Sequence, residues 1–290
     1  MSAKIIKGAP IAEEIRVELA KEIEGLKAKG FTPKLSVVLV GDDPGSVWYA
    51  RNKVSVGEKM GVVVEVTELP KDTPESDVVA LVKKLNADDK VHGILVELPL
   101  PKHINKANVM NAILPAKDVD GVTAEQRGYI LGDMEALALV PATPLACIEL
   151  VNRAGVDIKG KKVTVVGRGD TVGRPLAMLL LSKGRDATVT ICHSRTVDLA
   201  GAIKDADIVF AAAGAGANHL IKASMIKPGA TVIDAAINQK EDGSITGDVE
   251  PAAAEVAGVI TPVPGGVGSL TTTIIVGNTV KALKLQKSIK

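Results

Sequence analysis

The segment 161–181 constrains the fold most, because it joins a buried strand to a helix through a glycine-rich turn. The strand reads Val163-Thr-Val-Val-Gly167, the turn continues through Gly169 to Gly173, and an apolar helix follows. Glycines in such a turn let backbone N–H groups approach a pyrophosphate at the helix N-terminus. Strand, turn and helix in this order predict a dinucleotide-binding α/β unit. A tight turn that binds nothing is the alternative.

The strand that follows this helix indicates which dinucleotide is bound. An NAD site places Asp or Glu about twenty residues beyond the turn, where it binds the ribose hydroxyls. This chain has Cys192-His193-Ser194-Arg195 there and no carboxylate. A guanidinium from Arg195, with Arg168 nearby, suits a 2′-phosphate, so NADP is favoured over NAD. Arg195 as a solvated loop residue is the alternative. No second metal ligand accompanies His193 at helical spacing, so no metal is expected.

Strand-like and helix-like segments alternate along the chain, which predicts βαβ units in two α/β domains with a boundary near residue 140. In the first half we expect strands over 34–41, 62–69 and 91–98, and helices over 11–29, 46–60 and 75–85. In the second half we expect strands over 162–166, 188–192, 208–212, 231–234 and 258–260. Thr143 is expected to cap a helix that begins at Pro144, and residues 272–285 to form the last helix.

Composition excludes several classes of protein. The chain has 290 residues, which at about 150 residues per domain agrees with two domains. With 35 basic and 34 acidic residues it has no overall electrostatic drive toward nucleic acid. Two cysteines exclude a disulfide scaffold and a multi-cysteine zinc site. The N-terminus lacks the apolar core of a signal peptide, and no stretch is apolar enough for a membrane span, so we expect a cytoplasmic protein.

Candidate catalytic groups lie in the first half. Tyr49 and Lys53 are four residues apart in a predicted helix and therefore share one face. Glu97 ends a buried strand, and Asp118-Val-Asp120-Gly121 places two acids before a glycine. Loops at the carboxyl ends of strands are where α/β proteins bind ligands. Taken alone, Lys53 is also explained as a surface lysine that packs its stem against an aromatic ring.

In order along nearly the whole chain, these segments resemble the bifunctional methylenetetrahydrofolate dehydrogenase/methenyltetrahydrofolate cyclohydrolase family. The matching segments include 40–46 with Tyr49 and Lys53, 93–101, 115–121, 141–144, the glycine turn, 192–196, 206–208, 247–249 and 261–268. The resemblance implies an N-terminal α/β folate-binding domain over 1–140, on which the helix 272–290 packs. It further implies a C-terminal Rossmann-like NADP-binding domain over 141–271, a folate cleft between the domains, and a homodimer.

The resemblance also implies roles for single residues. Lys53 handles protons, Tyr49 stacks near the pterin, and Asp120 binds the amino-ring edge, where a carboxylate can accept two N–H bonds. Pro264, Gly265 and Gly266 border the cleft. The residues implied to bind NADP are Gly167, Arg168, Gly169, Gly173, His193, Ser194 and Arg195.

The activity implied is NADP-dependent oxidation of 5,10-methylenetetrahydrofolate to 5,10-methenyltetrahydrofolate, followed by hydrolysis to 10-formyltetrahydrofolate. The family usually has serine where this chain has Gly169, and glutamine where it has Glu97. A carboxylate beside Lys53 favours the ammonium form, which is a poor general base. We therefore expect measurable dehydrogenase with weakened or absent cyclohydrolase. Glu97 acting as the base itself, or turning away without effect, are the alternatives.

Two other functions stay open at this stage. One is a paralogue specialised to the dehydrogenase step or to a modified pterin carrier of one-carbon units. The other is a non-catalytic protein that keeps the fold and binds the cofactor. The presence of Tyr49, Lys53 and Asp120 together argues against the second.

Overall fold

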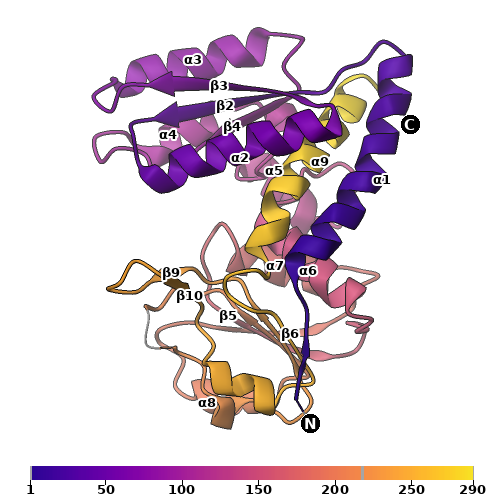
Figure 1. Ribbon diagram of the computed structural model, residues 1–290, viewed down its shortest axis with the longest axis vertical. Helices are drawn as coiled ribbons and strands as arrows, with labels where there is room; N and C mark the ends of the chain where they lie inside the picture. Colours follow the sequence, from indigo (N-terminus) through magenta and orange to yellow (C-terminus); the bar gives the residue numbers. More distant parts are fainter. Residues whose placement is uncertain (1, 217–218, 290) are drawn as a thin grey trace. The chain divides into compact units, whose positions relative to one another are not determined.

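The chain folds into two compact α/β units in the computed structural model, which describes residues 2–216 and 219–289 (Figure 1). The large-sheet unit contains the residues up to Glu13, Ile130–Asp133 and Pro141–Thr271. The small-sheet unit contains Glu14–Tyr129, Met134–Val140 and the chain from Thr272 onward. The alternation of strand-like and helix-like segments predicts this fold class.

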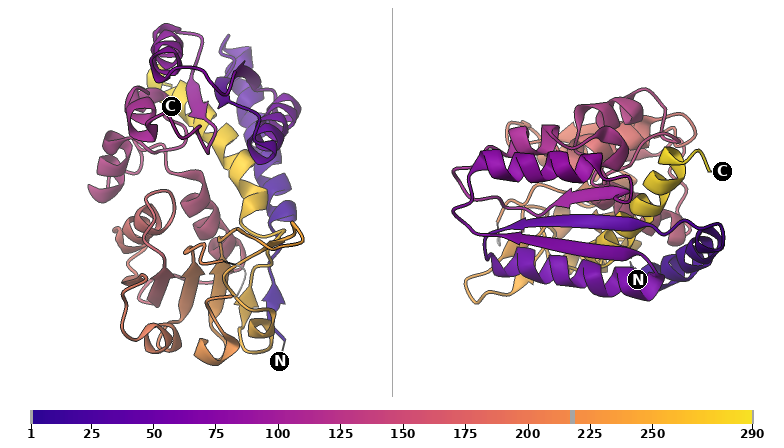
Figure 2. Two further views of the ribbon diagram at one scale, coloured as in Figure 1. Left: turned by 90° about the vertical axis from the view of Figure 1, so that its left-hand side faces the viewer. Right: turned by 90° about the horizontal axis from the view of Figure 1, so that it is seen from above.

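The small-sheet unit is built on three parallel strands in the order β3 (Val63–Leu69), β2 (Lys34–Val40) and β4 (Gly93–Val96). Six consecutive residues of the central strand β2 are buried, which explains its uninterrupted apolar sequence. Helices α2 (Pro44–Met60) and α3 (Glu75–Ala87) lie on either side of these strands (Figure 2). The apolar side chains of α3 pack on β2 and β4 as one cluster.

Two long helices complete this unit with parts of their length. Helix α1 (Gly8–Ala28) contributes its residues from Glu14 onward, and α9 (Gly268–Gln286) contributes those from Thr272. Together with α2 they form an apolar cluster that includes Ile23, Leu26, Val56, Met60, Val276, Val280 and Leu283. An ion pair of 2.6 Å between the Lys284 ammonium and the Glu22 carboxylate joins α9 to α1.

The large-sheet unit holds a six-stranded parallel sheet. Its strands stand in the order β1 (Lys4–Ile5), β11 (Val259–Ile260), β8 (Thr231–Asp234), β7 (Ile208–Ala211), β5 (Lys162–Val166) and β6 (Thr188–Cys192). The chain passes from β5 to β6 on one side and then returns to β7 on the other side. The carboxyl ends of β5 and β7 therefore flank the point where the strand order reverses, which is where such sheets bind ligands.

Helices α6 (Ala142–Arg153), α7 (Gly173–Leu181) and α8 (Leu199–Lys204) pack on this sheet. The remaining elements are α4 (Lys106–Asn111), α5 (Ala124–Leu131), the 3₁₀ turns η1 (Pro115–Lys117), η2 (Ala223–Met225) and η3 (Pro251–Glu255), and the hairpin of β9 (Asn238–Gln239) and β10 (Ile245–Thr246).

Three sequence-based expectations need correction. The first residues belong with the large sheet and not with the first domain, because β1 pairs with β11 in parallel register. Thr143 does not cap α6: this helix begins at Ala142 after an extended Pro141, without a side-chain cap. The last helix begins at Gly268, four residues earlier than expected.

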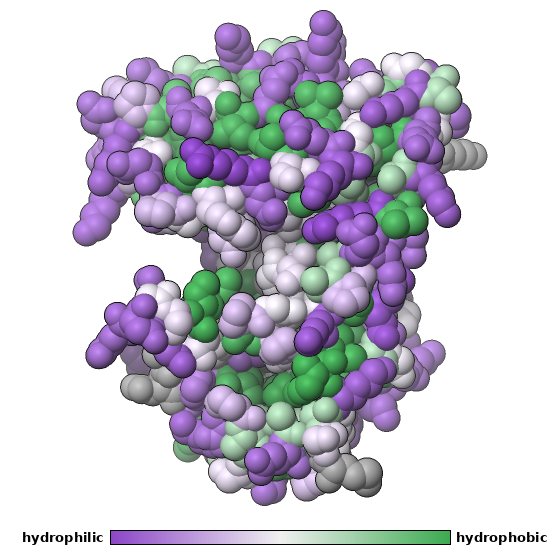
Figure 3. All heavy atoms as spheres, in the orientation of Figure 1, coloured by the Kyte–Doolittle hydropathy of each residue, from purple (hydrophilic) through white to green (hydrophobic). Residues whose placement is uncertain are grey.

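No helix among residues 2–216 and 219–289 is long and apolar enough to cross a membrane. On the face seen in Figure 3, hydrophilic side chains project from each unit, and the apolar surface of each unit is exposed in smaller areas among these side chains. The main apolar clusters lie inside each unit.

Asn278→Ala should destabilise the small-sheet unit. The buried Asn278 amide donates to the carbonyl oxygens of Val119 and Val140, both at 2.8 Å, and alanine leaves both carbonyls unsatisfied. We expect a loss of about 1–3 kcal/mol in the free energy of unfolding, measured by urea titration. The exposed Asn111→Ala is the control and should change little. Equal unfolding midpoints for the two variants would contradict this account.

Candidate functional site

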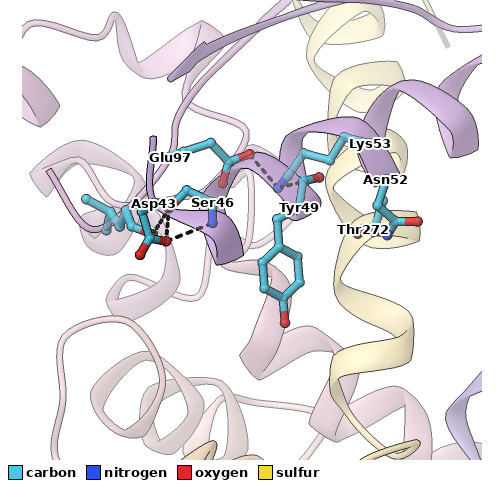
Figure 4. A network of polar contacts seen from close by, with 8 residues as sticks. Asp43, Ser46, Tyr49, Asn52, Lys53, Glu97 and Thr272 are labelled. Carbon is cyan, nitrogen blue, oxygen red and sulfur yellow. Dashed lines mark hydrogen bonds and ion pairs between the residues drawn. The ribbon is translucent and has the colours of Figure 1, made fainter. Parts of the chain in front are cut away.

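A buried ion pair forms the centre of the candidate site in the small-sheet unit. The Lys53 ammonium on α2 lies 2.7 Å from the Glu97 carboxylate, and the two residues are only 6% and 8% exposed. Figure 4 shows the two side chains pointing toward one another. Glu97 directly follows β4, and its N–H donates to the carbonyl of Val38, which continues the sheet pairing. The sheet therefore holds Glu97 rigidly opposite α2.

Tyr49 lies one helical turn before Lys53 and is half-buried. The Lys53 Nζ is 5.4 Å from the centre of the Tyr49 ring and 3.5 Å from the Tyr49 carbonyl oxygen. Trp48 packs edge-on against Tyr49, with ring centres 5.0 Å apart. The ammonium is thus surrounded by a carboxylate, a carbonyl and an aromatic ring, three groups that stabilise a positive charge.

Helix α2 is held in place by polar contacts near its start and its middle (Figure 4). Asp43 caps the helix by accepting from the Ser46 N–H at 2.9 Å, and the Ser46 hydroxyl lies 3.0 Å from the carbonyl of Leu98. Farther along, the Asn52 amide donates to the Thr272 hydroxyl at 3.1 Å. Sequence analysis missed these positioning residues, although Asp followed by Pro is a recognisable helix-start signal.

Asp120 lies in a tight turn beside β4. Asp118 forms an isolated parallel bridge with Ile94, its carbonyl accepts from the Gly121 N–H, and Gly121 has a left-handed φ of 64°. Burial and the neighbouring Asp118 carboxylate raise the pKa of Asp120 to about 7, against the opposing effect of Lys53. The charges of Lys53 and Glu97 also act on this carboxyl: Lys53 lowers the pKa of Asp120 and Glu97 raises it.

The glycine turn of the large-sheet unit requires glycine on steric grounds. Gly167 has φ +120°, and a Cβ there would meet the Ala212 carbonyl oxygen at 2.2 Å. A Cβ on Gly173, the first residue of α7, would lie 2.1 Å from the Gly167 carbonyl oxygen. Gly169, by contrast, faces open space. The backbone of this turn is therefore bare at the start of a helix, an arrangement that fits a pyrophosphate.

His193, Ser194 and Arg195 follow β6, next to this turn. The Gly167 N–H donates to the Cys192 carbonyl at 2.9 Å, which joins the ends of β5 and β6. His193 Nδ1 accepts from the Arg195 N–H at 3.1 Å and so orders the loop. Arg195 and Arg168 are both exposed at the carboxyl edge of neighbouring strands. The carboxyl ends of β5 and β6 can therefore bind an anionic ligand, with Arg168 after β5 and Arg195 after β6.

Pro264, Gly265 and Gly266 lie in the large-sheet unit, unlike Tyr49, Lys53, Glu97 and Asp120. The peptide before Pro264 is cis, and the Gly265 carbonyl accepts from the Gly8 N–H at 2.8 Å. This contact joins the loop to the start of α1. The contribution of the loop to folate binding stays a prediction.

Comparisons with known proteins cover the whole chain. Residues 6–120 match the family described as "Tetrahydrofolate dehydrogenase/cyclohydrolase, catalytic domain", and residues 141–287 match its "NAD(P)-binding domain". The bifunctional protein FolD of Heliobacterium modesticaldum is 52% identical over 99% of this chain and 98% of that protein.

Solved structures agree with this result. The bifunctional FolD methylenetetrahydrofolate dehydrogenase/cyclohydrolase of Campylobacter jejuni has a TM-score of 0.93 at 38% identity, covering 98% of this chain and all of that one. The Trypanosoma brucei enzyme, solved with NADP cofactor and inhibitor, has a TM-score of 0.90 at 36% identity, covering 100% of this chain and 99% of that one.

Asp120→Asn should change the pH dependence of stability. Because the pKa of Asp120 is raised from 3.8 to about 7, the folded state holds this proton more tightly than the unfolded state does. The wild-type protein therefore loses stability as the pH rises through this window, whereas the asparagine variant does not.

The measurement is thermal unfolding of the ligand-free protein at several pH values. We expect the melting temperature of the variant, relative to wild type, to increase steadily between about pH 4 and pH 8. Asp42→Asn, at an exposed position, is the control and should give a flat difference. A flat difference for Asp120→Asn as well would show that the carboxyl is solvated normally.

Proposed function

This chain belongs to the tetrahydrofolate dehydrogenase/cyclohydrolase family, and we propose that it oxidises 5,10-methylenetetrahydrofolate to 5,10-methenyltetrahydrofolate with NADP and hydrolyses the product to 10-formyltetrahydrofolate. The observation that carries the proposal is the buried Lys53–Glu97 pair beside Tyr49. Burying two charges is costly and adds little net stability, so such a pair marks a functional site.

The large-sheet unit supplies the NADP site in this proposal. Gly167, Gly169 and Gly173 present their bare backbone at the start of α7 to the pyrophosphate. Arg195, with Arg168, contacts the 2′-phosphate, and His193 and Ser194 shape the loop that carries Arg195. When bound, NADP supplies the hydride acceptor for the folate methylene carbon. The open space at Gly169, where the family usually has serine, removes one polar contact to the phosphate.

Tyr49 and Asp120 bind the pterin in this proposal, and Pro264–Gly266 borders the same ligand. The half-buried Tyr49 ring is held by Trp48 and offers one flat apolar surface. Asp120 accepts N–H bonds from the amino-ring edge, and it does so best when ionised. Because its pKa is about 7 without ligand, pterin binding favours loss of this proton near neutral pH.

The hydrolysis step depends on the Lys53–Glu97 pair. Water adds to the methenyl carbon and loses one proton. A carbon–nitrogen bond of the ring then breaks, the released nitrogen takes up the second proton of the water, and the oxygen becomes the formyl carbonyl. The Glu97 carboxylate lies 2.7 Å from the Lys53 Nζ and stabilises its positive charge, so Lys53 is a poor acceptor for the proton that the water loses first. Glu97 itself is the competing acceptor. The oxidation step needs alignment of the methylene carbon more than a base, so it is affected less.

A second candidate is a paralogue limited to the dehydrogenase step. The carboxylate of Glu97, at a position where the family usually has glutamine, is the observation that favours it. The test is purified protein with NADP and methylenetetrahydrofolate, with reduced NADP and methenyltetrahydrofolate followed as independent signals. Both signals with onward hydrolysis support the bifunctional proposal. Both signals with accumulating methenyltetrahydrofolate support the one-step enzyme. If neither signal appears, the remaining functions are an enzyme for a modified pterin carrier and a non-catalytic protein.

We also propose that the protein works in the cytoplasm as a homodimer, with folate bound by the small-sheet unit and NADP by the large-sheet unit. Support for the dimer comes from β6, whose outer edge pairs with no strand in the described part of the chain. Ile191 on this edge is 37% exposed. Sedimentation of the purified protein tests the assembly.

Arg195→Ala should weaken the binding of NADP more than the binding of NAD. The lost charge-assisted contact to the 2′-phosphate is worth about 1.5–3 kcal/mol, or roughly 10- to 150-fold in the dissociation constant. Titration with each dinucleotide measures the effect. Lys161→Ala, exposed at the opposite end of β5, is the matched charge-loss control. If the binding of NADP and of NAD is weakened equally, Arg195 does not contact the 2′-phosphate.

Glu97→Gln should raise cyclohydrolase activity while leaving dehydrogenase activity within about threefold, because a neutral amide removes the negative charge that pairs with Lys53. The two steps are assayed separately, and the exposed Glu68→Gln serves as control. A collapse of cyclohydrolase would instead identify Glu97 as the base. Unchanged rates in both steps would show that the departure from glutamine is silent.

A further inference from the structure

We infer that Asp248 is a positioning residue for the dinucleotide: its buried carboxylate holds the turn 213–216 in the shape that the nicotinamide half of NADP needs. The inference rests on the proposed function and concerns a residue that the mechanism above does not use. It is carried by the contacts of this carboxylate and by the place of the turn in the sheet.

The Asp248 carboxylate is fully buried and accepts four hydrogen bonds. Oδ2 accepts from the N–H groups of Ala213 at 2.8 Å and Gly214 at 3.0 Å. Oδ1 accepts from the Ala215 N–H and from the Asn238 amide, both at 3.0 Å. The other end of the Asn238 amide accepts from the Gly216 N–H at 2.9 Å. Asp248 and Asn238 thus hold four consecutive backbone N–H groups.

The turn 213–216 lies at the carboxyl edge of the sheet, where a dinucleotide would bind. It follows β7, and the carboxyl ends of β7 and β5 flank the point where the strand order reverses. A Cβ on Gly167 would meet the Ala212 carbonyl oxygen at 2.2 Å and the Ala213 nitrogen at 2.9 Å. The turn is therefore in direct contact with the glycine turn proposed to hold the pyrophosphate.

The two halves of the ligand fall on different sides of β5. Arg195, proposed for the 2′-phosphate of the adenosine half, follows β6 on one side. The turn 213–216 follows β7 on the other side. A dinucleotide with its pyrophosphate at Gly167 therefore extends its nicotinamide half toward the turn that Asp248 holds.

The position of Asp248 is itself fixed by a second buried carboxylate. Asp234, the last residue of β8, accepts from the N–H groups of Val249 at 2.9 Å and Ala236 at 3.0 Å. A Cβ on Gly247 would lie 2.0 Å from Asp234 Oδ2, so the chain can approach this closely only with glycine there. The two carboxylates tie the loops after β7, β8 and β10 together.

Only a carboxylate satisfies this arrangement. Four donors converge on the side chain, and an ionised aspartate offers two oxygens that accept from all of them. Asparagine keeps the shape but turns an NH₂ group toward backbone N–H groups, which leaves donors facing donors. Asp248→Asn should therefore release part of the turn without removing volume from the core.

The test compares NADP with 2′,5′-ADP, which carries the 2′-phosphate and adenosine but no nicotinamide. We expect Asp248→Asn to raise the NADP dissociation constant about tenfold, as when about a tenth of the molecules hold a competent turn. The 2′,5′-ADP constant should stay within twofold. Hydrogen exchange at the amides of 213–216 should accelerate in the ligand-free variant. Asp205→Asn, on the surface after α8, is the control and should change none of these readouts.

Asn238→Ala is the second variant, in case Asp248→Asn fails to fold. This variant removes one of the four donors to Asp248 and the acceptor for Gly216. We expect the NADP dissociation constant to rise about threefold and the 2′,5′-ADP constant to stay unchanged. Equal losses of affinity for NADP and 2′,5′-ADP would overturn the inference. So would unchanged NADP binding together with unchanged hydrogen exchange at the amides of 213–216. If the wild-type protein shows no detectable NADP binding, the proposed function is overturned instead.

Discussion

The buried pair of Lys53 and Glu97 is the interaction around which the candidate site of the small-sheet unit is arranged. A lysine on a helix and a glutamate at the end of a strand can remain charged in the interior only when they meet at hydrogen-bond distance. The capped start of α2, the Ser46 contact to Leu98 and the Asn52 contact to Thr272 all restrict where that helix can lie. The geometry of one ion pair is thus maintained by contacts on several elements.

In the proposed function, this pair affects the oxidation and hydrolysis steps differently. Stabilising the ammonium of Lys53 keeps a positive group beside Tyr49, which is compatible with binding and orienting a substrate. It opposes the use of Lys53 as a base in the hydrolysis of the methenyl group. In the proposed function, one side chain, glutamate in place of glutamine, therefore shifts the balance between the two activities without a change in the fold.

Aspartates organise the loops in both units by accepting backbone N–H bonds. Asp43 caps α2, Asp118 holds the turn that carries Asp120, and Asp248 holds the turn after β7. A carboxylate has enough lone pairs to satisfy several N–H groups that no strand or helix can pair. Loops that must present functional groups at the carboxyl edge of a sheet are stabilised in this way.

The sequence alone determined the local elements and the type of chemistry. Apolar runs and glycine turns predict the strands β2 and β5 to β8 because each run must be buried, and the spacing of Tyr49 and Lys53 places them on one helical face. Tertiary structure alone decided the rest. No local pattern specifies that β1 pairs with β11 or that Asn278 reaches Val119 and Val140. The family resemblance places Glu97 beside Lys53, but only the tertiary structure gives the 2.7 Å contact between them. These contacts join residues far apart in the chain, and their free energy arises only when packing brings the partners together and removes water from both.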